Sequence, residues 1–295
     1  MSPVRTGPGV GRVLGDVDVA RALAVCAQDP VAAVLATTRL EQASRVGLRR
    51  VGGQAWGYEV DGELRAVCWA GANLVPVVPA GSDDGLRAGA VEAFAAFGRA
   101  QGRRCSSVVG AAEVVMPLWE HLAPAWGTLR EVRADQPSLV IDHEPDLAPD
   151  PAVRRSVPDE YPVVLPACVR MFTEEVGYSP LGGSGGAYEA RVRSLVRDGR
   201  SFVRLEPGPT GAEVVFKAEL GAVAGGVAQV QGVWVTPARR GQGLSEGGMA
   251  AVVAAARRDV APVVSLYANH YNERALAAYR AVGFRQVGTY ATILF

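Results

Sequence analysis

Apolar and polar positions along the chain predict two successive sets of helices and strands. Helical periods occur at about residues 17–28, 86–100, 112–121, 164–176, 188–198, 245–258 and 272–282, with a helical or mixed segment at 32–42. Strand-like runs occur at about residues 55–60, 63–69, 73–78, 105–109, 201–206, 213–220, 227–235, 263–268 and 284–295. Asp61-Gly62 between two of these runs predicts a tight hairpin. The similar order of elements in the two halves predicts two copies of one α/β architecture.

A proline-rich acidic segment separates the two halves. Residues 142–162 read DHEPDLAPDPAVRRSVPDEYP and hold five prolines. Because proline removes a backbone donor and restricts its neighbour, this segment is expected to sustain neither helix nor sheet. We therefore predict a first domain at 1–142, a linker at 143–156 and a second domain at 157–295.

The amino-acid composition indicates a folded protein and bears on the partners that it can bind. The 295 residues are 49% hydrophobic and 20% charged, which is sufficient for a large core and unlike a disordered chain. Thirty basic residues balance thirty acidic ones, so we expect no nucleic-acid partner and no binding to an anionic membrane. Lys217 is the only lysine, which we attribute to codon bias in a GC-rich genome.

Cysteine spacing and hydropathy give further expectations. The four cysteines (Cys26, Cys68, Cys105 and Cys168) stand far apart, so we expect no metal and no disulfide framework. The first twelve residues lack the apolar stretch of a signal peptide. Charged residues and glycines interrupt the apolar run at about 214–235, which excludes a membrane span there. We therefore expect a cytoplasmic protein.

The clearest chemical signal lies at residues 233–245, which read VWVTPARRGQGLS. A strand pattern ends at a proline, and a turn with two glycines then opens an alanine-rich helix. Gly241 and Gly243 allow a ligand to approach the backbone closely. The first amides of a helix have no internal partners, and the helix dipole favours an anion there, such as a pyrophosphate. Ser245 is the expected N-cap of this helix.

Three other interpretations of this turn come into question. A Walker loop requires a Gly-Lys-Ser/Thr sequence, and this segment holds no lysine. The dinucleotide-binding fingerprint requires a third glycine where Glu246 stands. An ordinary glycine turn between a strand and a helix remains open.

Arg240-Gly241-Gln242-Gly243-Leu244-Ser245 resembles the Arg/Gln-x-x-Gly-x-Gly/Ala signature of the GNAT acyltransferases, with Ser245 departing from the usual Gly or Ala. The resemblance implies two tandem GNAT-like lobes, each with a mixed, mostly antiparallel sheet flanked by helices. It also implies that acetyl-CoA binds as acyl donor, with its pyrophosphate on the Gly241–Ser245 amides and its pantetheine arm beside Val233, Trp234 and Val235.

A second segment, residues 265–284, resembles a later motif of the same family. A strand is followed by a helix that begins at Asn272, and Tyr279 lies two turns further on, before Gly283-Phe284. The resemblance implies that Asn272 and Tyr279 adjoin the cofactor and that Tyr279 reprotonates the leaving thiolate. The alternative is that Tyr279 is a half-buried aromatic residue with no catalytic role.

The first half shows the order of elements without this signature. After its third strand it has Pro79-Ala80-Gly81-Ser82-Asp83-Asp84-Gly85, where two carboxylates would repel a pyrophosphate. We interpret this half as a degenerate lobe, and the whole layout resembles actinobacterial tandem GNAT proteins with an uncharacterised N-terminal part. Residues 182–186 match Gly-x-Ser-x-Gly, but they lack the strand that a nucleophile elbow requires, so we interpret them as a loop.

These observations predict an N-acetyltransferase that moves acetyl from acetyl-CoA to a primary amine of a small molecule or protein in a ternary complex. The candidate bases are Glu219, the nearest carboxylate by sequence, and the terminal carboxylate of Phe295, should the apolar end of the chain be ordered. The alternatives are a regulator that binds acetyl-CoA without turnover and a tandem acyltransferase like the mycothiol synthases. The protein is expected to be a monomer or homodimer.

Overall fold

The computed structural model describes residues 3–182, 186–209 and 211–295. Their contacts divide into two compact units. The first holds the residues up to Ser138 together with Tyr267–His270 and Val287–Phe295, and the second holds Leu139–Leu266 and Tyr271–Gln286. The predicted linker at 143–156 stays a prediction as a domain boundary. No described helix is both long enough and apolar enough to cross a membrane.

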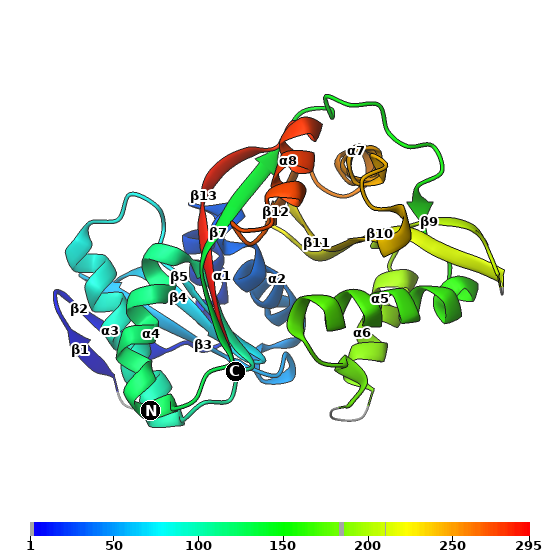
Figure 1. The fold of residues 1–295 in the computed structure, drawn as a ribbon. Coiled ribbons are helices and arrows are strands. Elements are labelled where there is room, and N and C mark those ends of the chain that lie inside the picture. Colours follow the sequence, from blue (N-terminus) through cyan, green and yellow to red (C-terminus); the bar gives the residue numbers. More distant parts are fainter. Residues whose placement is uncertain (1–2, 183–185, 210) are drawn as a thin grey trace. The chain divides into compact units, whose positions relative to one another are not determined.

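The first unit is a sheet covered by two pairs of helices (Figure 1). Its elements are β1 (Val4–Thr6), β2 (Gly9–Val13), α1 (Val19–Cys26), α2 (Pro30–Val46), β3 (Gln54–Val60), β4 (Glu63–Ala70), β5 (Asn73–Val77), α3 (Asp84–Gln101), β6 (Ser107–Ala111), α4 (Ala112–Trp126) and the start of β7 (Glu131–Ile141). Strands β1 to β5 are antiparallel neighbours, and β5 and β6 are parallel.

Side chains alternate between the two faces of this sheet and form two cores. On one face, Phe94 of α3 and Leu118 of α4 pack with Trp56 of β3. On the other face, Leu40 of α2 packs with Trp69 of β4. Successive residues of a strand point to opposite faces of the sheet, and here both faces are buried.

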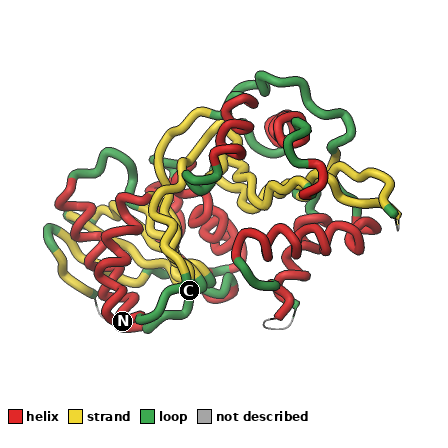
Figure 2. The backbone as a smooth tube through the Cα atoms, viewed as in Figure 1, coloured by secondary structure: helices red, strands yellow, loops and turns green. Residues whose placement is uncertain are grey.

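The second unit holds the remaining elements: β8 (Arg154–Arg155), α5 (Tyr161–Val176), α6 (Ala187–Arg197), β9 (Ser201–Gly208), β10 (Gly211–Ala224), β11 (Val227–Val235), α7 (Leu244–Asp259), β12 (Val263–Tyr267), α8 (Glu273–Val282) and the start of β13 (Arg285–Leu294). Strands β8 to β11 are antiparallel, and β11 and β12 are parallel. The mixed helices and strands of both units are visible in Figure 2, and the α/β (α+β) class is confirmed.

Helices cover the strands of the second unit closely. Val164 and Cys168 of α5 pack with Val203 of β9. Gly248 of α7 lies so near β10 that a methyl group there would approach the Phe216 ring to 2.6 Å. Small residues on α7 therefore bring the start of this helix close to the strands.

Four features differ from the sequence expectations or were not among them. Strand β8 lies inside the segment expected to hold no strand, because residues 152–157 between two prolines keep their backbone donors. The glycine-rich hairpin β1–β2 and the strand β7 were not predicted. The end of β13, assigned by sequence to the second domain, pairs through Tyr290–Leu294 with β6 of the first unit.

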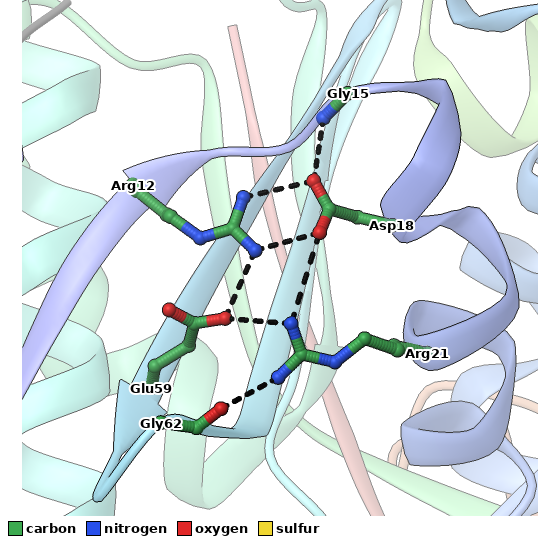
Figure 3. Close-up of polar contacts among 6 residues, drawn as sticks. All are labelled: Arg12, Gly15, Asp18, Arg21, Glu59 and Gly62. Atoms are coloured by element: carbon green, nitrogen blue, oxygen red, sulfur yellow. Dashed lines mark hydrogen bonds and ion pairs between the residues drawn. The ribbon is translucent and has the colours of Figure 1, made fainter.

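Four charged side chains tie the N-terminal hairpin to its neighbours (Figure 3). Arg12 of β2 donates two hydrogen bonds to Asp18, at 2.8 and 2.6 Å, and a third to Glu59 of β3 at 2.9 Å. Arg21 of α1 also donates to Glu59, at 3.0 Å. Hydrogen bonds from Arg12 lower the pKa of Asp18 from 3.8 to about 2 and lower the pKa of Glu59. A bidentate arginine pair of this kind is stronger than a neutral hydrogen bond.

We predict that this network makes the stability of the first unit depend on acid pH. Because the folded pKa of Asp18 is depressed, its stabilising contribution is present above about pH 4 and is lost as the pH falls towards 2. Arg12→Met should lower the free energy of unfolding by about 1–3 kcal/mol at neutral pH and by much less at pH 2. Urea unfolding of both proteins across this range measures the difference.

The exposed arginine Arg65 of β4 provides the matched control. Arg65→Met should leave the pH profile of the unfolding free energy unchanged. An Arg12→Met protein whose stability deficit is the same at pH 2 and pH 7 would show that the Arg12–Asp18 pair is not the titrating element.

Candidate functional site

The turn between β11 and α7 presents an open backbone. Gly241 and Gly243 have φ values of +78° and +73°, in the left-handed region where glycine is favoured. A Cβ atom placed on either would meet no described atom within 4 Å beyond its chain neighbours. Gly243 is the N-cap of α7 and carries no side chain that could accept from the first helical amides. The amides are therefore available to an external anion.

Ser245 does not cap this helix, contrary to expectation. Helix α7 begins at Leu244, so Ser245 is its second residue and Gly243 occupies the N-cap position. The left-handed conformation of Gly243 turns the chain into the helix one residue before the predicted start. As a consequence the Ser245 amide is among the first-turn donors.

The corresponding helix start in the first unit is already occupied by a carboxylate. Asp83 is the N-cap of α3, and its Oδ1 accepts a hydrogen bond from the Leu86 amide at 2.8 Å. A carboxylate at this position takes the donor that a phosphate would use and adds repulsion. This contact supports the interpretation of the first half as a lobe without the anion site.

Charged side chains anchor the α7 turn to neighbouring elements. Arg239 contacts Glu206 of β9 and donates to Gln242 at 2.8 Å. Arg240 donates to the Val235 carbonyl at 3.0 Å and contacts Glu174 of α5 at 2.5 Å.

Glu174 thereby joins the turn to the last residues of β11. Its carboxylate also accepts from the Trp234 indole at 3.2 Å. The structure thus places Glu174 beside two of the predicted cofactor-binding residues. An anion that binds Arg240 must therefore share this guanidinium with Glu174.

Strand β11 leaves its parallel neighbour halfway along its length. Among the described residues, β11 is paired with β12 only over Val227–Gln229. On its other side β11 stays paired with β10 up to Val235. No described strand is therefore in register with residues 230–235 on the β12 side, which include the predicted Val233–Val235 edge. An extended ligand arm can pair with such an edge through backbone hydrogen bonds.

Tyr279 lies on α8 with its side chain buried. The Asn272 side chain caps this helix by accepting from the Ala275 amide at 3.3 Å, as predicted. Burial raises the pKa of Tyr279, and the nearby charge of Glu175 raises it further. Tyr279 is therefore protonated at neutral pH, the state in which a general acid begins. Its place beside a cofactor, and that of Asn272, stay predictions.

Glu219 is buried and paired. Its carboxylate lies 2.7 Å from the Lys217 ammonium and accepts from the Cys168 thiol at 3.3 Å. Burial acts to raise the pKa of Glu219, but Lys217 outweighs it and the pKa is lowered. A carboxylate held ionised in this way takes up a proton less readily than a free one, and its role as a base stays a prediction.

Phe295 belongs to the first unit, so neither unit by itself holds both this residue and the α7 turn. Its ring packs edge-on against Trp119 and Trp126, with centroids 5.6 and 5.7 Å away. Its amide donates to the Ser106 carbonyl at 3.1 Å. These contacts hold Phe295 in place, whereas a catalytic role for its carboxylate stays a prediction.

His270 lies outside the turn and the β11 edge. It is exposed, and its ring nitrogen contacts the Asp135 carbonyl. All four cysteines are buried and free. Of the Gly-x-Ser-x-Gly segment, residues 183–185 lie outside the described residues.

Comparison with known proteins identifies a family resemblance. Residues 201–284, which contain the turn, the β11 edge and Tyr279, match the model of the acetyltransferase (GNAT) family. This part of the chain is therefore similar to the GNAT acetyltransferases. Residues 53–164 match a domain of unknown function, DUF4081. None of the curated proteins searched matches the chain.

Solved structures extend the GNAT fold over nearly the whole chain. A GCN5-related N-acetyltransferase from Sphaerobacter thermophilus aligns with a TM-score of 0.56 at 18% identity, covering 98% of this chain and 96% of that one. A GNAT-family acetyltransferase from Colwellia psychrerythraea aligns at 0.51 and 12%, covering 97% and 99%. A tandem GNAT protein from the clavulanic acid biosynthesis pathway aligns at 0.51 and 13%, covering 96% and 97%. The predicted tandem GNAT fold is confirmed.

We predict that a carboxylate at the start of α7 abolishes the anion site. Gly243→Asp would reproduce the capped arrangement of Asp83 in α3 and should weaken coenzyme A binding at least about a hundredfold, through repulsion and loss of a free amide. Isothermal titration calorimetry measures the affinity.

Gly243→Asn is the matched control, because asparagine has nearly the same shape, tolerates a positive φ and carries no charge. It should weaken binding much less than the aspartate. Equal affinity of the folded aspartate variant and the wild type would show that this turn does not hold the phosphates.

Proposed function

We propose that this protein transfers an acetyl group from acetyl-CoA to a primary amine, with both substrates bound at once in the second unit. The observation that carries the proposal is the open, uncapped start of α7 beside the unpaired edge of β11. One element suits a pyrophosphate and the other an extended amide-bearing arm, and the two follow each other directly in the chain. Coenzyme A combines these two chemical features.

The donor would be held at two places. The amides from Gly241 to Ser245 would face the pyrophosphate, and Arg240 would add a positive charge. The backbone of Val233–Val235 would pair with the pantetheine arm. This arrangement would leave the thioester near the point where β11 and β12 part, after Gln229.

The reaction would then require alignment and two proton transfers. The neutral amine attacks the thioester carbonyl, a C–N bond forms, the C–S bond breaks, and the electron pair leaves on sulfur. We propose that Tyr279 gives its proton to the thiolate, since its raised pKa keeps the phenol protonated until a strong base forms beside it. The ammonium proton of the attacking amine passes to a base, for which Glu219 is the candidate within the second unit; a role for the Phe295 carboxylate, which belongs to the first unit, stays a prediction.

The acceptor is proposed to be an amine of a small molecule or a protein. Free-thiol release from acetyl-CoA, measured over a panel of amines that includes precursors of low-molecular-weight thiols, tests the activity and includes the mycothiol-synthase-like alternative. Tight acetyl-CoA binding without thiol release for any amine would favour the non-catalytic regulator instead.

We predict that Tyr279→Phe lowers turnover by roughly 10- to 10⁴-fold, as expected for the loss of a general acid. The acetyl-CoA dissociation constant should stay within about threefold of wild type, because the ring and its packing are retained. Steady-state kinetics and calorimetry on the same preparation separate the two effects.

Tyr161→Phe is a suitable control in the same unit. The Tyr161 hydroxyl is buried with no described hydrogen-bond partner, so its loss should change neither turnover nor binding. Unchanged turnover in the Tyr279→Phe protein would show that Tyr279 contributes packing and is not the general acid.

A further inference from the structure

Lys217 is a fully buried cation that the proposed reaction does not use. It is the only lysine in the chain, and its side chain is 0% exposed. Its Nζ lies 2.7 Å from Glu219 and donates to the Gly232 carbonyl at 2.9 Å. A buried ion pair is seldom more stable than apolar residues of the same volume. The hydrogen bond to Gly232 is therefore the contact that an apolar replacement could not supply.

Gly232 lies at an irregularity in β11. Its φ is +59°, and a Cβ atom there would come within 3.1 Å of both Lys217 Nζ and Met171 Cε. The pairing of β10 with β11 shifts at this place, from Glu219 opposite Gln231 to Lys217 opposite Trp234. One residue of β10 therefore faces two residues of β11, which is a β-bulge.

The bulge divides β11 into two parts with different neighbours. Before it, Val227–Gln229 pair with β12, and after it comes the unpaired edge Val233–Val235. A bulge bends its strand and changes which backbone groups point to each side. The direction of the Val233–Val235 amides and carbonyls thus depends on the conformation at Gly232.

We propose that Lys217 is a positioning residue that holds the Gly232 bulge and so aims the Val233–Val235 edge at the pantetheine arm. This inference rests on the proposed function, because it assigns Lys217 to the same acetyl-CoA site. The ammonium is a compact donor that reaches the Gly232 carbonyl from β10. Glu219 supplies the neutralising charge, and the Cys168 thiol donates to the same Glu219 oxygen.

The charges facing Lys217 and Glu219 support this division of roles. Burial by itself would lower the pKa of Lys217, but Glu219 and Cys168 outweigh it and the pKa is raised. Burial raises the pKa of Cys168 to about 12, so the thiol stays protonated and can donate. Arg191 contributes further to keeping Glu219 ionised. The ammonium therefore persists at physiological pH, where it is needed as a donor to Gly232.

The test separates binding of the pantetheine arm from overall stability. In Lys217→Met/Glu219→Leu both charges are removed together, so no unpaired charge is left and the melting temperature should stay near that of wild type. The Gly232 carbonyl nevertheless loses its donor. Acetyl-CoA affinity should fall about tenfold or more, while affinity for adenosine 3′,5′-bisphosphate stays within about twofold. The bisphosphate lacks pantetheine and probes the α7 turn alone.

Two other variants complete the design. Cys168→Ala keeps the Lys217 contact with Gly232 and should leave acetyl-CoA affinity unchanged. Gly232→Ala strains the positive φ and displaces Lys217, so it should reproduce the selective loss even where the double variant folds poorly.

Unchanged acetyl-CoA affinity in the folded double variant or in Gly232→Ala would overturn the inference, as would an equal loss of both ligands. A wild-type protein that does not bind acetyl-CoA would instead contradict the proposed function.

Discussion

The separation of β11 from β12 after Gln229 is the constraint on which the candidate site depends. A strand that stayed paired along its whole length would have no free edge, and an extended ligand could not add to it. The bulge at Gly232 lies within the free part of the strand, directly before Val233–Val235, and a buried lysine contacts it from β10. The sheet thus combines a buried charge with an unpaired edge on adjacent strands.

The starts of two helices show how one architecture can hold different chemistry. Helix α3 of the first unit begins at an aspartate whose carboxylate accepts from its own first turn, whereas α7 of the second begins at a glycine. An N-terminal turn can satisfy its amides internally or offer them to a ligand. This single difference supports anion binding by the second unit and explains why the tandem GNAT fold need not contain two equivalent sites.

The sequence predicted regular elements well where side-chain pattern and turn chemistry agree. Strand β11 has the predicted bounds, Val227–Val235, and the Asp61-Gly62 hairpin has positive φ at both residues, as such a turn requires. The β1–β2 hairpin was missed because it is rich in glycine. A Cβ atom at Gly11 would come within 2.7 Å of the Ala93 side chain, so close packing of α3, which the local pattern does not show, accounts for that residue. Strand β7 was missed because Arg133, Gln136 and Ser138 are polar and yet buried.

By itself the sequence determined the glycine turn, the helix cap at Asn272 and the order of elements, since each depends on residues close together in the chain. The tertiary structure decided the partners of individual charges. Glu219, a candidate base by its position, is paired with Lys217, and Glu174 contacts Arg240 from a helix 66 residues away in sequence. It also decided that the last strand pairs with β6 of the first unit. Burial and pairing between distant segments set these outcomes, and periodicity along a single segment contains no information about either.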